Sequence, residues 1–231
     1  MNIIIQAGGK GTRLGRHTKN KPKCLVEFDG KTLLQRQLEL YKGNKIIIIG
    51  DYKIDILKKY VTTFFGEYNA LIVDAKGGKG TLSGLRAALS RIDNDDPIAF
   101  MWSDIVFDEP LIHRESDIQV FTTTNFLCRY RLSDNNEIIK ERSTNDGIMG
   151  AFTIKNKHIL SSIPETGSFV SGWLNNNIDK FNVLKTRVSF VREVGELHHL
   201  DREFQNTTSR FFNSIQIKED EVIKECIDRE Y

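Results

Sequence analysis

Glycine and basic residues are concentrated directly after the first apolar run of the chain. Residues 2–6 read Asn-Ile-Ile-Ile-Gln, and residues 7–13 read Ala-Gly-Gly-Lys-Gly-Thr-Arg. Because glycine has no Cβ, the backbone N–H groups of such a loop can come close to phosphate oxygens. The guanidinium of Arg13 can bind two of these oxygens at once. The loop therefore predicts a phosphate-binding site formed by Ala7, Gly8, Gly9, Gly11, Thr12 and Arg13.

More positive charge follows this loop within the first 23 residues, at Lys10, Arg16, Lys19, Lys21 and Lys23. Two familiar phosphate loops are excluded. The Walker pattern requires Ser or Thr after Gly-Lys, whereas Lys79 is followed by Gly80. A dinucleotide fingerprint requires a third glycine where Leu14 stands. The pattern thus favours a polyphosphate ligand bound in another way.

A carboxylate follows another apolar run. Asp104 comes just after residues 98–102, which read Ile-Ala-Phe-Met-Trp. A carboxylate held at the end of a strand can bind Mg²⁺ beside the oxygens of a triphosphate. We therefore expect Mg²⁺ as the cofactor, held by Asp104 and a second carboxylate. The histidines and the three cysteines, Cys24, Cys128 and Cys226, lack the spacing of a zinc site or a disulfide framework.

Strand and helix patterns alternate through the first half of the chain. Apolar runs predict strands at residues 2–6, 45–49, 70–73 and 98–102, and helical spacing predicts helices at 34–41, 54–64 and 82–92. Such alternation indicates a largely parallel sheet with helices on both faces. Ligands of such sheets bind beyond the carboxyl ends of the strands. The glycine loop and Asp104 both follow predicted strands, so we expect them to meet there.

The second half of the chain has a different character. β-rich runs at residues 118–124, 126–132, 137–140 and 148–155 predict a mixed, partly antiparallel region. A helix near 169–178, a strand near 187–191, a helix near 200–204 and a closing strand near 212–217 complete the prediction.

The composition indicates one folded domain spanning 1–231. With 39% hydrophobic residues and a net charge of +2, the chain is not typical of a disordered or nucleic-acid-binding protein. No run reaches the roughly 18 apolar residues of a membrane helix, and no secretory leader is recognisable. We therefore expect a cytoplasmic protein with small-molecule substrates and neither nucleic acid nor membrane as partner. A homo-oligomer is left open.

Residues 7–13, then Thr18 and Lys21-Pro22-Lys23, resemble the G-G-x-G-T-R loop and following P-K of the sugar-phosphate nucleotidyltransferases. The resemblance is closest to the short bacterial enzymes that make capsules and surface polymers. It implies a Rossmann-like, three-layer α/β/α fold of the GT-A-like type, with a small mixed β region for the acceptor. It also implies that a nucleoside triphosphate, CTP or UTP rather than GTP, is joined to a sugar 1-phosphate or another small phosphomonoester with release of pyrophosphate.

The resemblance also assigns roles to residues. Arg13 would hold the β- and γ-phosphates, and Lys23 would bridge the α-phosphate and the incoming phosphate. Gly80 and Thr81 match the step at which the family reads the nucleotide base. Asp104 would bind metal and nucleotide, and Glu193 matches a late acidic residue that would complete the metal site.

The acceptor is less defined. Residues 128–173 should line its pocket, and Asp146, Glu165, Ser168 and Trp173 are the candidates to contact it. An amino group on the acceptor would favour the carboxylates and Trp173, whereas a sugar would favour Ser and Asn partners. Some related proteins carry a fused kinase-like domain, so a further domain after Tyr231 is left open.

Two other functions compete with nucleotidyl transfer. In a glycosyltransferase of related fold, Ser103-Asp104 would be half of a D-x-D metal motif, but Trp102 stands where the first aspartate should be. The other alternative is a non-catalytic nucleotide-binding subunit that has the same fold. The presence of Arg13, Lys23 and Asp104 favours catalysis.

Overall fold

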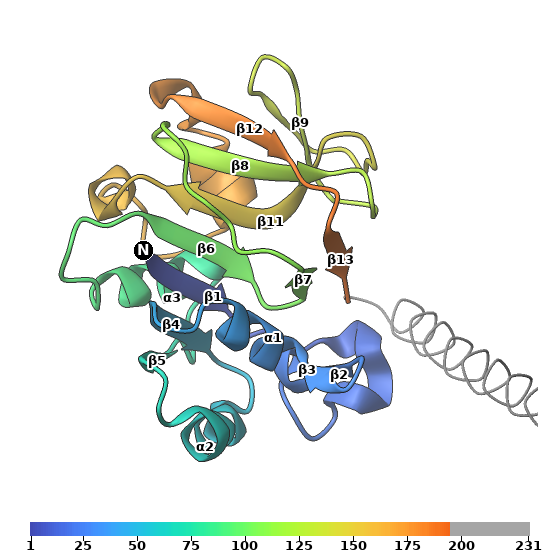
Figure 1. The fold of residues 1–231 in the computed structure, drawn as a ribbon. Helices are drawn as coiled ribbons and strands as arrows, with labels where there is room; N and C mark the ends of the chain where they lie inside the picture. Colours follow the sequence, from blue (N-terminus) through green and yellow to red (C-terminus); the bar gives the residue numbers. More distant parts are fainter. Residues whose placement is uncertain (195–231) are drawn as a thin grey trace, which may run out of the picture.

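A computed structural model describes residues 1–194, which are built around one large mixed sheet (Figure 1). The strands are β1 Asn2–Gln6, β2 Glu27–Phe28, β3 Lys31–Thr32, β4 Lys45–Gly50, β5 Ala70–Asp74, β6 Ile98–Trp102, β7 Ile105–Phe107, β8 Ile118–Thr123, β9 Arg131–Leu132, β10 Ile138–Ile139, β11 Gly147–Ile154, β12 Val183–Arg187 and β13 Val191–Glu193. The α-helices are α1 Leu33–Leu40, α2 Ile54–Phe65 and α3 Thr81–Leu89.

The four strands predicted from apolar runs form the parallel part of the sheet. Their order is β6-β1-β4-β5, and Gln6 of β1 lies opposite Ile49 on one side and Trp102 on the other. The isoleucines of β1 and β4 are fully buried because helices cover both faces of these strands. The carboxyl ends of β1, β4, β5 and β6 therefore share one edge, as predicted.

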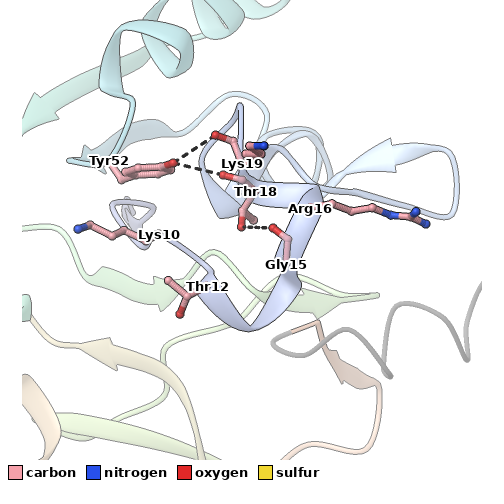
Figure 2. Close-up of a pocket in the computed structure, with 7 residues that line it drawn as sticks. All are labelled: Lys10, Thr12, Gly15, Arg16, Thr18, Lys19 and Tyr52. Carbon is pink, nitrogen blue, oxygen red and sulfur yellow. Dashed lines mark hydrogen bonds between the residues drawn. The ribbon is translucent and has the colours of Figure 1, made fainter.

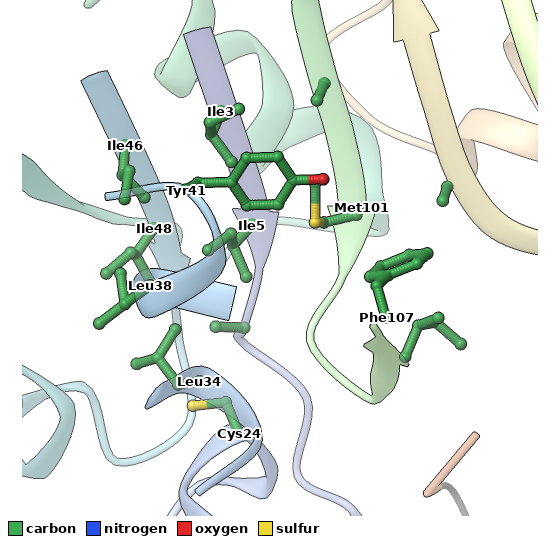
Figure 3. Packing of buried hydrophobic residues seen from close by; sticks show 14 of the residues in the cluster. Ile3, Ile5, Cys24, Leu34, Leu38, Tyr41, Ile46, Ile48, Met101 and Phe107 are labelled. Atoms are coloured by element: carbon green, nitrogen blue, oxygen red, sulfur yellow. The ribbon is translucent and has the colours of Figure 1, made fainter. Parts of the chain in front are cut away.

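Helices pack on both faces of the sheet, which confirms the predicted three-layer α/β/α architecture. On one face, the odd-numbered positions of β1 pack against α1 and α2; Figure 3 shows Ile3 and Ile5 beside Leu34, Leu38 and Tyr41. On the other face, Ile4 packs with α3 and with the helix Phe169–Leu174. The alternation of the strand pleat thus gives each face its own core.

The second half extends the sheet beyond β6. β11 pairs antiparallel with β6 and β8, and β12 runs parallel to β8. The mixed, partly antiparallel region predicted after Asp104 is therefore confirmed. The run 126–132 contributes only the short strand β9, which pairs with β10 across a turn at 134–136.

Some predicted elements differ from those observed. The strand expected near 187–191 falls between two strands that belong to different sheets: β12 ends at Arg187 and β13 begins at Val191. The helix expected near 169–178 is a π-helix at Phe169–Leu174 followed by a 3-10 turn at Ile178–Lys180. The elements predicted near 200–204 and 212–217 lie outside the described residues. No helix among residues 1–194 is long and apolar enough to cross a lipid bilayer.

Candidate active site at the carboxyl edge of the sheet

The glycine loop leaves β1 at the shared carboxyl edge and turns back on itself. The backbone N–H of Ala7 donates to Ile49 O at 2.9 Å, while Gly8 is packed so closely that a Cβ there would lie 2.9 Å from Asp51 Cβ. Gly9 is exposed, and its carbonyl accepts from Lys23 N at 3.4 Å. The loop is thus fixed at its base and open at its tip.

Gly11 shows why this loop requires glycine. Its φ is +65°, and a Cβ would lie 2.9 Å from both Lys23 Cβ and Thr18 Cγ2. The Thr18 hydroxyl donates to Gly11 O at 2.9 Å, which ties the two ends of the 3-10 segment Thr12–Thr18 together. Thr12 and Arg13 are exposed in the first turn of this segment. Of the predicted phosphate-binding residues, Gly9, Thr12 and Arg13 are therefore exposed, whereas Ala7 and Gly8 are buried at the base of the loop.

Lys23 and Asp104 meet although 81 residues separate them in the chain. Lys23 Nζ donates to Asp104 Oδ2 in an ion pair whose side chains are only 10% and 18% exposed. Lys23 comes after the glycine loop in the chain, whereas Asp104 lies in the turn between β6 and β7. The pair places an ammonium and a carboxylate against the glycine loop, at the edge where the polyphosphate site was predicted.

Glu193 comes close to Asp104 through its backbone. β13 pairs antiparallel with β7 so that Glu193 lies opposite Ile105, and Val194 N donates to Asp104 O at 2.9 Å. Burial raises the pKa of the Cys128 thiol to about 12, and the negative charge of Glu193 adds to this increase. The two predicted metal ligands therefore sit on neighbouring segments joined by backbone hydrogen bonds.

The fit of this site to Mg²⁺ rests on Asp104. Its carboxylate already binds one cation, the ammonium of Lys23, and it offers the oxygen ligands that Mg²⁺ prefers. Within residues 1–194, no group of three or more His, Cys, Asp and Glu side chains gathers to form a metal cage. A magnesium ion held here would therefore need oxygens from its substrate as well, which is usual for triphosphate sites.

A basic pocket of about 310 Å³ opens beside the loop. Figure 2 shows its lining, which includes three cationic side chains and no acidic one: Lys10, Thr12, Gly15, Arg16, Thr18, Lys19 and Tyr52. The Tyr52 hydroxyl donates to Thr18 O and Lys19 O, each at 3.4 Å, and so supports the outer side of the loop. Sequence reasoning missed Tyr52; its place just after Gly50, at the carboxyl end of β4, was the available signal.

The second predicted loop, Gly80-Thr81, is engaged with residues near Ser168. Gly167 N donates to Lys79 O at 2.9 Å, and Phe169 N donates to the Thr81 hydroxyl at 2.8 Å. Gly80 has φ +81°, and a Cβ there would lie 2.2 Å from Gly167 O. This loop therefore joins the start of α3 to the helix Phe169–Leu174, and a base-reading role for it stays a prediction.

Gly80→Ala should lower the free energy of unfolding by about 3 kcal/mol or more, because backbone strain adds to a collision with Gly167. Gly77→Ala is the matched control, since Gly77 has φ +82° but a Cβ at this position would have no atom within 4 Å. We expect the control to lose about 1 kcal/mol. Urea denaturation of both variants measures the difference, and equal losses would show that the contact with Gly167 is unimportant.

Three acceptor candidates lie around the helix Phe169–Leu174. Trp173 is only 4% exposed and stacks on Phe169 with ring centroids 5.6 Å apart, so it offers no free face to a ligand and belongs to the core. The Ser168 hydroxyl caps the helix by accepting from Ser171 N at 3.3 Å. Glu165 is exposed and lies 4.0 Å from Arg86. Within residues 1–194, no hydrogen bond or ion pair joins these three side chains to Lys23 or Asp104.

Asp146, the fourth acceptor candidate, is neutralised by neighbouring cations. Its carboxylate lies 2.7 Å from Arg187 and 3.3 Å from Lys185. The hydrogen bond from Arg187 holds the pKa of Asp146 below its ordinary value of 3.8, and the bond from Lys185 adds to this effect. The arrangement joins β12 to the start of β11, which is a structural role that the sequence did not reveal.

Asp146→Asn should destabilise the protein by about 1–2 kcal/mol at neutral pH, since Arg187 loses its counter-charge and Lys185 keeps only its pair with the exposed Asp134. Asparagine tolerates the φ of +51° found here. Because the pKa of Asp146 is lowered on folding, its contribution is present above about pH 4 and is lost as the pH falls further. The two proteins should therefore differ in unfolding free energy at pH 7 and become more alike at pH 3. Glu141→Gln, at an exposed pair with Arg131, is the control.

Trp102 is a second residue that sequence reasoning did not place in the site. It ends β6, is partly exposed, and lies over Gly150, where a Cβ would come within 1.9 Å of Trp102 Cε3. Gly150 has φ +86° and sits at a register shift between β11 and β8. An aromatic side chain is thereby seated two residues before Asp104, at the same edge of the sheet.

Comparison with known families agrees with this geometry. Residues 3–117, which contain the glycine loop, Lys23 and Asp104, match the MobA-like NTP transferase domain. This part of the chain is a MobA-like NTP transferase domain. The resemblance to the sugar-phosphate nucleotidyltransferases inferred from the first loop is thereby confirmed.

Relatives of this NTP transferase domain include the CTP:phosphoglutamine cytidylyltransferase of Campylobacter jejuni, 29% identical over 122 residues that cover 49% of this chain and 47% of that protein. The chain therefore spans about half the length of this relative. HddC from Yersinia pseudotuberculosis, solved with GMP-PN, superposes with a TM-score of 0.71 at 19% identity, covering 89% of this chain and 99% of its own. CTP:phosphocholine cytidylyltransferase of Streptococcus pneumoniae gives 0.69 at 19% identity, covering 90% and 98%. These two likenesses establish the fold.

Proposed function

We propose that this chain is a magnesium-dependent nucleotidyltransferase, which joins a nucleoside triphosphate to a small phosphomonoester and releases pyrophosphate. The observation that carries the proposal is the meeting of Lys23 and Asp104 against the glycine loop. A reaction between two phosphate anions needs cations on the transferred group and a carboxylate for the metal, and both lie at this edge. The family membership of residues 3–117 supports the same chemistry.

The ion pair suggests how the site accepts its substrate. Before binding, Asp104 neutralises the ammonium of Lys23 at little exposure to water. A phosphate oxygen can replace Asp104 at Lys23, and a cation can replace Lys23 at Asp104, so every buried charge remains compensated. Mg²⁺, held by Asp104 and Glu193, would supply charge neutralisation for the triphosphate. Arg13 and the exposed loop amides would hold the departing pyrophosphate.

No general base is required in this mechanism. A phosphomonoester carries close to two negative charges at neutral pH, so its oxygen can attack the α-phosphorus directly. The protein has to offset repulsion and hold attacking and leaving oxygens in line. Contact with both the α-phosphate and the incoming phosphate is the role we assign to Lys23.

CTP or UTP is the proposed nucleotide. The names of the Campylobacter and Streptococcus relatives specify CTP, and that of a Haloferax volcanii relative, 30% identical over 114 residues, specifies UTP and glucose 1-phosphate. We further propose a cytoplasmic enzyme whose product serves capsule or surface polysaccharide synthesis. This last step rests on the resemblance to short bacterial enzymes of those pathways.

The test combines purified protein and Mg²⁺ with each of the four ribonucleoside triphosphates and a panel of esters: glucose 1-phosphate, phosphocholine and phosphoglutamine. We expect pyrophosphate release with one triphosphate, and none when EDTA removes the metal. Thermal stabilisation by each triphosphate with Mg²⁺ is measured in parallel. Absence of both stabilisation and release would contradict the proposal, and sugar transfer from a nucleotide sugar would favour the glycosyltransferase.

A further inference from the structure

Gln37 is a buried polar residue on an otherwise apolar face of α1. It is 1% exposed, whereas its neighbours on that face are Leu33, Leu34 and Leu38, which pack in the cores. A leucine or methionine there would avoid the desolvation of an amide. Within the described residues, Gln37 Oε1 is buried and has no hydrogen-bond partner, so burial of this oxygen costs free energy. The amide nitrogen, in contrast, makes two hydrogen bonds.

The Gln37 amide closes the turn that carries Asp104. Its Nε2 donates to Trp102 O and to Ile105 O, each at 3.0 Å. These two carbonyls bracket Ser103 and Asp104, so one side chain of α1 spans the turn between β6 and β7. The bonds are buried or nearly so, and they are therefore shielded from competition with water.

Other contacts fix the same turn through the backbone. Ser103 N donates to Gln6 O at 3.2 Å, and Val194 N donates to Asp104 O at 2.9 Å. The turn is thus held from β1, from the residue that follows β13, and from α1. Of these three restraints, only the one from Gln37 is made by a side chain, and a substitution can remove it without altering strand pairing.

We propose that Gln37 is a positioning residue for Asp104: by clamping the Trp102–Ile105 turn, its amide directs the Asp104 carboxylate toward Lys23. The catalytic consequence rests on the nucleotidyltransferase function proposed above, but the geometric claim does not. Small displacements of a charged group lower catalysis strongly, since the reacting atoms must be held in register. Gln37 would therefore affect turnover although it touches neither substrate nor metal.

The test uses two variants that remove the donor while keeping the length of the side chain. Gln37→Met has no donor, and the carboxyl group of Gln37→Glu has no donor when ionised and a single one when protonated, so it cannot reproduce both hydrogen bonds of the amide. Gln35→Met is the control: it is the same change on the same helix, at a side chain whose amide donates to Glu39 at the surface, at 2.9 Å. An effect shared by both Gln37 variants and absent from the control comes from the lost donor.

Two measurements are made on the full chain. The first is the rate at which an amine-modifying anhydride labels Lys23, read by mass spectrometry relative to the exposed Lys58 of α2, with neither nucleotide nor metal present. We expect labelling of Lys23 to rise about threefold to tenfold in both Gln37 variants, because an ion pair shields its amine from reaction. The second is turnover, where we expect kcat to fall about tenfold to a hundredfold while KM for the triphosphate changes less than about threefold.

The outcomes separate the two proposals. Wild-type labelling in both Gln37 variants, or wild-type kcat in an active protein, would overturn the positioning role. If the wild-type protein transfers no nucleotide but Lys23 labelling still rises in both Gln37 variants, the positioning role is retained and the proposed function is rejected. If the methionine variant does not fold, the glutamate variant and the labelling of Lys23 in Gln37→Asn, whose amide is too short to reach both carbonyls, provide the same test.

Discussion

Lys23→Met is expected to slow pyrophosphate release about a thousandfold, which corresponds to ~4 kcal/mol of transition-state stabilisation. Lys23 is the buried cation beside the glycine loop, and methionine keeps most of its length without its charge. Steady-state assays with saturating triphosphate and ester measure the effect. Lys31→Met is the control, because Lys31 forms an exposed ion pair with Glu39 at 2.7 Å, away from the loop.

The same substitution should also reduce stability. Removing Lys23 leaves the Asp104 carboxylate without its counter-charge at an 18% exposed position, at an expected cost of ~2 kcal/mol. A folded Lys23→Met protein with normal turnover would show that the transferred phosphate is neutralised elsewhere. Circular dichroism and urea denaturation separate loss of fold from loss of chemistry.

Asp104→Asn is expected to lower turnover about a hundredfold or more and to raise the Mg²⁺ concentration needed for half-maximal rate. Asparagine keeps the shape of the side chain but removes the charge that a divalent cation requires. The rate is measured as a function of Mg²⁺ at constant triphosphate. Asp108→Asn serves as the control, since Asp108 follows β7 and pairs with Arg192 at 3.0 Å on the surface.

The two substitutions should be coupled. Combining Lys23→Met with Asp104→Asn removes both members of one ion pair, so the double variant should be ~1–3 kcal/mol more stable than the sum of the single losses predicts. Activity should stay as low as in the worse single variant. An unchanged magnesium requirement in Asp104→Asn would place the metal on other ligands, and additive stability losses would show that the pair is not formed in solution.

Much of the fold follows from local sequence patterns. The isoleucine runs of β1 and β4 are buried on both faces, and their lack of alternation already indicates a parallel sheet covered by helices. Prediction was less successful in the second half, where short strands such as β9 and β13 depend on partners rather than on their own composition. β13 is three residues long and exists because it pairs with β7.

The roles of the acceptor candidates depend on tertiary contacts that could not be predicted from the sequence. Trp173 was a candidate for binding the acceptor, but its ring is stacked in the core on Phe169. Asp146 was a candidate for the same task, but Lys185 and Arg187, which follow it by 39 and 41 residues, neutralise it. Aromatic and acidic residues suit a binding site and a core or ion pair equally well, so residue type alone could not decide.

Local sequence patterns were enough to predict the chemical groups of the site: a glycine loop with basic residues after one buried strand and an aspartate after another. These signals are local, because an apolar run and the backbone freedom of glycine are properties of residues that are neighbours in the chain. Three contacts could be found only in the folded chain: Lys23 pairs with Asp104, Gln37 spans the Asp104 turn, and Gly80 packs on Gly167. Those contacts join segments far apart in the chain, and their geometry is set by how the connections between strands cross the sheet.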